Sequence, residues 1–422
     1  MLIRFSAGNH LSMREPQELS LVASSLKDDE GGLIKCDRVP GGKLLPAAVV
    51  YGANASGKSN FVSALEFMRD AILYSHSRGE PEGGIPRLSF ALDPECNRES
   101  SVFEADFVVE GVRYFYGFEC TDKAFETEWL YAFPSSRKQV LFERSGGEFK
   151  FGRGLRGRKD VIADLTRPNS LFLSAAVQNH HKHLSMIVSF FRGLIVDTRI
   201  VMPGNYASLT FMQGNVDARV IRFLEAIGTG VFDYRRRQQD TSEQEKAFIQ
   251  AIDKAIRETL DPPPEFNIDH SEISVELAHR GQDGEPVYFD LARESAGTRR
   301  LLVVLSHVFN ALDNGAAFVI DELDASLHTQ ACEALLTLFS SPKSNPKGAQ
   351  LIATTHDTNL MRSPLLRRDQ VWLCEKDQAG ATHIYPLTDI RTRKGDNIEK
   401  GYLQGRYGAI PFAGSILDLV AA

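Results

Sequence analysis

Residues 52–59, Gly-Ala-Asn-Ala-Ser-Gly-Lys-Ser, fit the pattern G-x-x-x-x-G-K-[ST]. An apolar run, 45–51, precedes this stretch, and 60–73 carries apolar residues at the spacing of one helix face. A buried strand, a glycine-rich turn and a helix in this order favour a β layer covered by helices. The backbone N–H groups of the turn and the positive end of the helix are then expected to face one anion.

The residue types in this loop suit a nucleoside triphosphate such as ATP, bound with Mg²⁺. Glycines let the backbone curl around phosphate oxygens, Lys58 is expected to meet the β- and γ-phosphates, and Ser59 is expected to hold Mg²⁺. The alternative is a chance match, which the flanking strand and helix make less favourable. The predicted nucleotide-binding residues are Gly52, Asn54, Ser56, Gly57, Lys58, Ser59 and Asn60.

A second apolar run, 316–320, ends in the acids Asp321 and Glu322. Asp321 suits the shell of Mg²⁺, and Glu322 suits a general base that polarises an attacking water. An apolar strand followed by two acids is common by chance, so the alternative is a strand that ends at a polar surface.

A third apolar run, 350–354, leads to His356, which is predicted to contact the γ-phosphate and the attacking water. Taken alone, a histidine here is more often structural. In a parallel sheet, however, ligands bind beyond the carboxyl ends of the strands. The three runs together therefore predict that Lys58, Glu322 and His356 converge as the catalytic residues around one nucleotide.

A short polar segment, 294–300, stands just before an apolar helical pattern, 301–312. Ser295 suits the start of a helix, and Gly297 allows a phosphate to come close. An ordinary helix start is the alternative reading. With the other motifs, this segment resembles the signature loop of ABC-type ATPases, which implies that Ser295, Gly297 and Thr298 bind the nucleotide of a partner subunit. Residues 323–326 stand where the D-loop of such proteins crosses the dimer interface.

The rest of the chain divides by pattern into three predicted regions. Residues 1–158 include alternating segments at 102–109 and 112–118 with a Glu-Gly turn between them, which predicts a hairpin. Residues 159–268 are predicted to be a helical insertion, with an amphipathic helix at 247–260 and three prolines at 262–264. Residues 269–422 are predicted to form a second lobe of alternating strands and helices.

Composition narrows the class of protein. The formal net charge is −7, which argues against a surface that holds nucleic acid everywhere but leaves room for a local basic groove. No apolar run reaches the length of about 20 residues that a membrane helix needs, and the chain does not start like a signal peptide. We therefore expect a cytoplasmic protein without a membrane partner. The five scattered cysteines suggest neither a zinc site nor a disulfide framework.

The segments GANASGKSN, SAGT, FVIDELDASLH and TTHD together resemble the SMC/RecF branch of ABC-type ATPases. More closely, the chain resembles the RloA/AriA-like ATP/GTP phosphatase family of bacterial anti-phage defence operons, through the additional segments 128–131, 171–174 and 402–411. The resemblance implies an α/β, ABC-type P-loop ATPase head with a parallel-core sheet, an antiparallel β subdomain and a helical insertion. Because the signature is Ser-Ala-Gly-Thr, transport is not implied.

This resemblance implies an ATPase that works as a homodimer or higher homo-oligomer. It senses or restrains an effector protein, a nuclease or toxin from the same operon, and a phage protein or nucleic acid acts as the trigger. The stretch after His356 is too short for a fused Toprim nuclease domain. A RecF-like DNA-repair ATPase and a stand-alone nuclease remain as alternatives. The histidines of 179–183 are predicted to lie on a polar helix surface.

Overall fold

The computed structural model describes residues 1–26, 28, 32–135, 137–197, 216–240, 271–362, 364 and 366–410. The chain forms two compact units, Met1–Arg199 with His307–Ala422, and Ile200–Ser306. The first unit therefore also contains the three helices between residues 159 and 193, which the sequence assigned to the insertion. The predicted helix at 247–260, the prolines at 262–264 and the predicted boundary at 268–269 lie outside the described residues.

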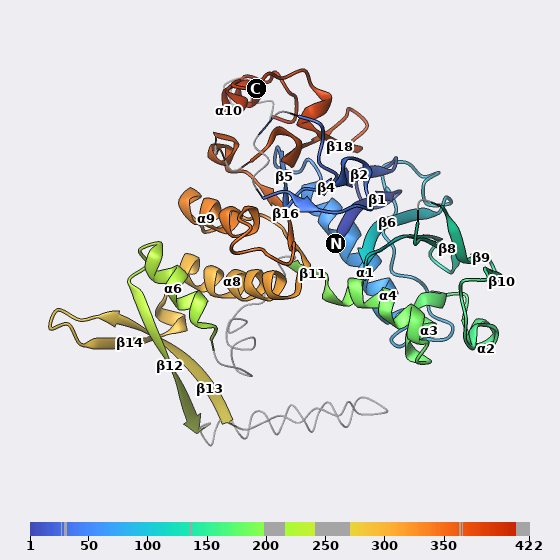
Figure 1. Cartoon of the computed structure of the whole chain (residues 1–422), viewed down its shortest axis with the longest axis horizontal. Helices are drawn as coiled ribbons and strands as arrows, with labels where there is room; N and C mark the ends of the chain where they lie inside the picture. The colour runs from blue at the N-terminus through green and yellow to red at the C-terminus, as the bar shows by residue number, and fades with distance from the viewer. Residues whose placement is uncertain are drawn as a thin grey trace, which may run out of the picture. The chain divides into compact units, whose positions relative to one another are not determined.

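A six-stranded sheet forms one layer of the first unit (Figure 1). Every neighbouring pair is parallel except the last, which is antiparallel. All residues of β5, β15 and β16 are buried, which explains their short, continuous apolar runs. The order is β11 (Ile195–Asp197), β15 (Ala317–Ile320), β16 (Gln350–Thr355), β5 (Ala47–Gly52), β17 (Val371–Lys376), β18 (Thr382–Pro386).

A seven-stranded antiparallel sheet forms a second layer, which confirms the predicted antiparallel β subdomain. Its predicted hairpin is β6–β7, and the turn residues Glu110 and Gly111 have φ values of 48° and 73°, as a tight hairpin turn requires. Its order is β10 (Glu148–Phe151), β9 (Gln139–Ser145), β8 (Phe125–Phe133), β7 (Val112–Cys120), β6 (Ser101–Val109), β1 (Leu2–Gly8), β2 (Gln17–Ser20). Strands β3 (Ile34–Lys35) and β4 (Lys43–Leu44) form a separate pair.

Helix α1 (Lys58–Tyr74) contributes to one core shared by both sheets. Its Phe61 ring meets the ring of Phe5 on β1 edge-on at 5.3 Å, and Val50 of β5 belongs to the same core cluster. The helix that follows the glycine-rich turn is thus held by buried apolar contacts with strands of both layers. The other helices of this unit are α2 (Lys159–Asp164), α3 (Phe172–Gln178), α4 (Lys182–Gly193), α9 (Thr329–Ser340) and α10 (Ile398–Leu403).

The second unit contains a three-stranded antiparallel sheet, β12 (Val231–Asp240), β13 (Ser271–Arg280) and β14 (Pro286–Asp290), with helix α6 (Ala218–Ala226). Helix α8 (Ala296–Asn314) begins in this unit and ends in the first. Its start at Ala296 confirms the prediction that Ser295 stands at the start of a helix, five residues before the apolar pattern begins. Ser295 caps the first turn, since the Thr298 N–H donates to Ser295 Oγ at 3.0 Å.

The histidine-rich segment 179–183 was predicted to be a polar helix surface, which is wrong for His181, although Asn179, His180 and Lys182 are exposed. His180 has a φ of 55°, which breaks the helix between α3 and α4. His181 is buried, and its Nδ1 accepts a hydrogen bond from the Leu184 N–H at the start of α4. Within the described residues, no group of three or more His, Cys, Asp or Glu side chains is arranged for a metal ion.

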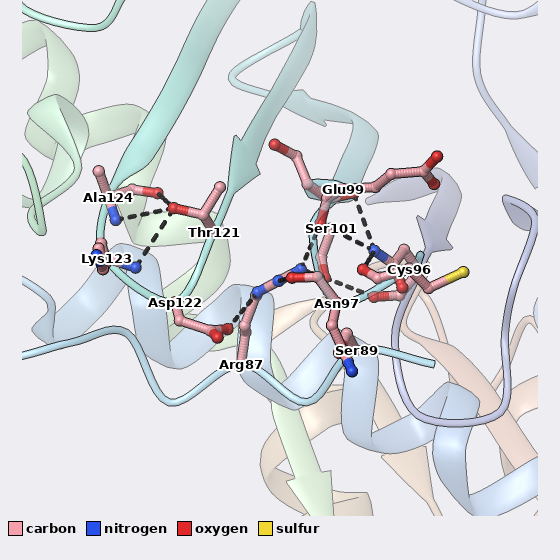
Figure 2. A network of polar contacts seen from close by, with 12 residues as sticks. Arg87, Ser89, Cys96, Asn97, Glu99, Ser101, Thr121, Asp122, Lys123 and Ala124 are labelled. Carbon is pink, nitrogen blue, oxygen red and sulfur yellow. Dashed lines mark hydrogen bonds and ion pairs between the residues drawn. The ribbon is translucent and has the colours of Figure 1, made fainter. Parts of the chain in front are cut away.

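The loop between α1 and β6 is fixed by Arg87, as Figure 2 shows. This guanidinium donates to the Asp122 carboxylate at 2.6 Å and to the carbonyls of Glu99 and Asn97, both at 2.8 Å. The same loop meets the β1–β2 turn, where the Leu11 N–H donates to the Leu88 carbonyl at 2.7 Å. Arg87 therefore supports the turn that carries Ser12.

Candidate functional site

Three strand ends meet at one edge of the parallel sheet. Strand β5 leads into the glycine-rich loop, β15 into the two acids and β16 into His356, and β16 lies between the other two. Beyond this edge lies a cavity of about 490 Å³. Its lining brings together seven consecutive loop residues with residues that follow the other strands: Asn54, Ala55, Ser56, Gly57, Lys58, Ser59, Asn60, Glu322, His356 and Lys376.

The two glycines of the loop stand where no side chain fits. Gly57 has a φ of 109°, and a Cβ there would lie 2.0 Å from Thr382 Oγ1. A Cβ on Gly52 would lie 2.2 Å from the backbone oxygen of Cys374. The loop therefore follows its tight path only with glycine at both positions. Gly52 does not line the cavity itself; it sets the path of the residues that do.

Two features of the loop leave hydrogen-bond donors for an anion. Helix α1 has no side-chain cap, so the N–H groups at its positive end remain available to a ligand. Ser56 Oγ is buried without a hydrogen-bond partner among the described residues. Lys58 Nζ donates to the carbonyls of Gly52 and Ala53, both at 2.9 Å, and burial lowers the pKa of this lysine. These features fit a polyphosphate.

A small polar cluster of Ser12, Asn60 and Thr382 supports the loop through the Ser56 carbonyl, and the sequence patterns did not indicate this cluster. Thr382 Oγ1 donates to the Ser56 carbonyl at 2.8 Å, and Ser12 Oγ lies 2.7 Å from Thr382 Oγ1. Asn60 Nδ2 donates to Ser12 Oγ at 2.6 Å. Since these residues come from three distant parts of the chain, no local spacing could have connected them.

The acidic pair is oriented by the neighbouring strand. Asp321 is nearly buried, and its Oδ1 accepts from Thr354 Oγ1 at 2.5 Å. The Glu322 N–H donates to the same hydroxyl at 2.7 Å, and Glu322 has a φ of 50°. This left-handed backbone ends β15 abruptly, while the Glu322 residue lines the cavity. Asp321, the residue before Glu322, does not line the cavity, and its Oδ1 already accepts the hydrogen bond from Thr354.

His356 is exposed and lines the cavity, and its backbone is held by Asp324. The Asp324 carboxylate Oδ1 accepts from Thr355 Oγ1 at 2.8 Å and from the His356 N–H at 3.2 Å. One residue later, Asp357 Oδ2 accepts from Thr329 Oγ1 at 2.5 Å. The loop after β15 is thus tied to the loop after β16 by two carboxylates.

Residues 47–362, more than half of the chain, match the family described as "AAA domain, putative AbiEii toxin, Type IV TA system". The chain belongs to this AAA-domain family. Among solved structures it is similar to the SMC head domain from Thermotoga maritima, at 16% sequence identity and a TM-score of 0.38, over 91% of this chain and 98% of that chain. A comparison with curated proteins found no match.

As a member of this AAA-domain family, the chain is a P-loop ATPase by fold, with the matched region spanning the glycine-rich loop, the acidic pair and His356. No helix among the described residues is both long enough and apolar enough to cross a membrane. The family match does not distinguish the RloA/AriA-like branch from other members, so the assignment to that branch stays a prediction.

The signature residues lie in the other unit of this AAA-family chain. Ser295 Oγ accepts from the Thr298 N–H and lies 2.9 Å from Thr298 Oγ1, and Gly297 is in the same first turn of α8. Just before them, Glu294 Oε1 lies 2.8 Å from His279 Nε2 on β13. Their contact with a nucleotide stays a prediction.

Lys376 is a lining residue that the sequence patterns missed. It is the last residue of β17, the strand beside β5 on the side away from β16. The signal was present, since an apolar run at 371–374 ends in the charged residues Glu375 and Lys376, as the run at 316–320 ends in Asp321 and Glu322. Without the strand order, nothing placed this run next to the glycine-rich loop.

Proposed function

We propose that this protein binds ATP with Mg²⁺ in the cavity at the carboxyl edge of the parallel sheet and hydrolyses it. The observation that carries the proposal is that the glycine-rich loop, Glu322 and His356 line one cavity although they come from three strands. The buried Ser56 hydroxyl without a partner and the uncapped start of α1 support an anionic ligand.

Each residue then has one task. Lys58 leaves its two carbonyl partners and meets the β- and γ-phosphates, while the loop N–H groups hold the phosphate oxygens. Ser59 and the free oxygen side of the Asp321 carboxylate hold Mg²⁺, which supplies charge neutralisation for the phosphates. Glu322 accepts a proton from the attacking water, and His356 contacts the γ-phosphate.

The proposed active form is a homodimer or higher homo-oligomer. In it, Ser295, Gly297 and Thr298 of one subunit complete the site of the other, so that ATP joins two copies. Support comes from the helix start itself: Ser295 caps α8, and Gly297 has no side chain to obstruct the approach of a phosphate. The proposed ATPase lobes are residues 1–158 and 269–422, and the proposed helical insertion is 159–268, although its helices α2, α3 and α4 belong to the first compact unit.

In the cell, we propose a cytoplasmic sensor or regulator of a partner effector, a nuclease or toxin, in anti-phage defence. The family description names a toxin of a type IV toxin–antitoxin system, which fits a role in such systems. The segments at 128–131, 171–174 and 402–411 support the RloA/AriA-like branch. A phage protein or nucleic acid is the proposed trigger.

The test compares ATP binding and ATP turnover in the purified full chain and three variants. Wild type is expected to bind ATP with Mg²⁺ and to release phosphate. Glu322→Gln should keep binding and lose at least about 100-fold in turnover, because the general base is removed. Lys58→Ala should lose binding, and Glu148→Gln, at an exposed position on β10, should behave as wild type. No heat of ATP binding in wild type, or full turnover in Glu322→Gln, would refute the proposal.

A further inference from the structure

We infer that Lys376 is a second phosphate-binding cation of the cavity, acting on the affinity for the triphosphate rather than on the chemical step. This inference rests on the proposed nucleotide function. It extends the site to a strand, β17, that none of the sequence motifs includes. The class of ligand it recognises is a polyphosphate, through charge.

The register of the sheet places Lys376 on the face of the glycine-rich loop. Cys374 pairs with Gly52 of β5, and its Sγ lies 3.5 Å from the Ser56 carbonyl, so the Cys374 side chain faces the loop. Side chains two residues apart on a strand share a face, so Lys376 faces the same way. Glu375, between them, points elsewhere, since its Oε2 accepts from the Ala409 N–H at 2.8 Å.

The neighbouring strand gives the same answer independently. Lys376 is directly opposite Thr382 of β18 in the antiparallel pair. Residues directly opposite in such a pair share a face, and Thr382 donates its hydroxyl to the Ser56 carbonyl. Two separate strand relationships thus put the Lys376 side chain beside the loop, in agreement with its place in the cavity lining.

The Lys376 ammonium is left available for a ligand. Within the described part of the chain its ammonium forms no hydrogen bond or ion pair, and the residue is exposed toward the cavity. Lys58, by contrast, is buried and bonded to two carbonyls. Because Glu322 adds a negative charge to the lining, and a magnesium-bound triphosphate keeps net negative charge, a second cation at the rim offsets this repulsion.

The experiment measures dissociation constants for ATP with Mg²⁺ by calorimetry in the full chain. Lys376→Met is expected to bind about tenfold more weakly than wild type, and Lys376→Arg within about threefold, because arginine keeps the charge. Turnover at saturating ATP should change less than about threefold in both. Lys343→Met is the control, since Lys343 is an exposed lysine on the loop that leads to the amino end of β16, away from the cavity edge.

Inorganic tripolyphosphate separates a phosphate contact from a nucleoside contact. As a competitor of ATP, tripolyphosphate should bind Lys376→Met more weakly than wild type by about the same factor as ATP does. Raising the salt concentration should weaken ATP binding by wild type more than ATP binding by the variant. Unchanged ATP affinity in Lys376→Met, or a loss for ATP without a loss for tripolyphosphate, would overturn the inference while the proposed ATPase stands. If wild type binds no ATP, the proposed function itself fails. If Lys376→Met does not fold, Lys376→Gln replaces it, provided that its thermal unfolding temperature equals that of wild type.

Discussion

The hydroxyl of Thr354 donates to the Asp321 carboxylate across two neighbouring parallel strands, at 2.5 Å. The same hydroxyl accepts from the Glu322 N–H, so one side chain on β16 orients both acids that follow β15. A threonine that uses its donor and its acceptor in this way links the proposed metal ligand and the proposed base through a single atom. The acidic pair therefore depends on β16 as well as on its own strand.

Replacing Thr354 by valine should remove this link while keeping the shape of the side chain. We expect Thr354→Val to lower ATP turnover about 10- to 100-fold and to reduce the free energy of unfolding by about 1–3 kcal/mol, because the buried Asp321 Oδ1 loses the hydroxyl that donates to it. Phosphate release and urea unfolding measure the two effects. Thr354→Ser keeps the hydroxyl and should stay close to wild type; equal turnover in Thr354→Val would contradict the orienting role.

Gly57→Ala should disrupt the glycine-rich loop. Its φ of 109° and the 2.0 Å approach of a Cβ to Thr382 Oγ1 both oppose alanine. We expect loss of ATP binding by calorimetry and a reduction of about 2–4 kcal/mol in the free energy of unfolding. The control is Gly111→Ala in the β6–β7 turn, where φ is 73° but no atom lies within 4 Å of the new Cβ. That change should cost only about 1 kcal/mol and leave binding intact.

Glu128 joins two of the segments that resemble the defence family but lie outside the nucleotide motifs. Its buried carboxylate accepts from the N–H groups of Phe172 and Leu173, at 2.7 and 3.0 Å, and from the Tyr116 hydroxyl at 2.9 Å. We expect Glu128→Ala to reduce the free energy of unfolding by about 3–5 kcal/mol, measured in urea, because several buried donors lose their acceptor. Glu143→Ala removes a similar bond to Tyr131 at a partly exposed site, and should cost less than about 1 kcal/mol.

His10 should make the protein less stable in weak acid. The ring is buried against the rings of Phe67 and Phe103, neither nitrogen has a hydrogen-bond partner among the described residues, and burial lowers its pKa from 6.5 to about 4. Between these values the unfolded chain holds a proton that the folded chain does not, so stability present above pH 6.5 is lost as the pH falls toward 4.

The expected loss from His10 between pH 7 and pH 5 is about 2 kcal/mol. Urea unfolding at both values, in wild type and in His10→Leu, isolates this contribution from that of other groups. The variant should lose about 2 kcal/mol less than wild type over the same interval. An identical pH dependence in the two proteins would show that His10 is not responsible.

The proposed shared site predicts an oligomer that depends on Ser295. Glu322→Gln with ATP and Mg²⁺ should elute as a dimer or larger species in size exclusion with light scattering, because ATP stays bound between subunits. Adding Ser295→Arg should keep ATP binding to each subunit but shift the mass to the monomer. Adding Ser189→Arg, at an exposed position on α4, should not. A monomer in the first sample would remove the basis for a shared site.

The sequence was a reliable guide wherever one strand could be recognised from its own residues. Buried parallel strands need apolar side chains on both faces, so 45–51, 316–320 and 350–354 stood out. The glycine-rich turn after the first run and the polar residues after the other two marked the carboxyl edge. The glycine-rich loop was recognisable because phosphate binding and a tight turn both restrict its residues.

Strand order and tertiary contacts were not accessible in the same way. Nothing local says that β17 lies beside β5, and so Lys376 and the Thr382–Ser12 support were missed. His181 was expected on a polar surface, but it is buried as the cap of α4, because packing between distant segments decides which side of a histidine meets solvent. In the proposed dimer, the contact between the signature turn and a nucleotide depends on a second subunit, which no pattern within one chain describes.

The place of β5 in the sheet has a consequence for how the protein is made. Both of its neighbours, β16 and β17, come from residues 350–376, although β5 itself ends at residue 52. During synthesis this strand, which is fully buried in the folded protein, therefore stays without the two strands that pair with it until most of the chain has left the ribosome. Nascent chains stopped before residue 376 should expose this strand to chaperones, and nucleotide can begin to protect the fold only after that point.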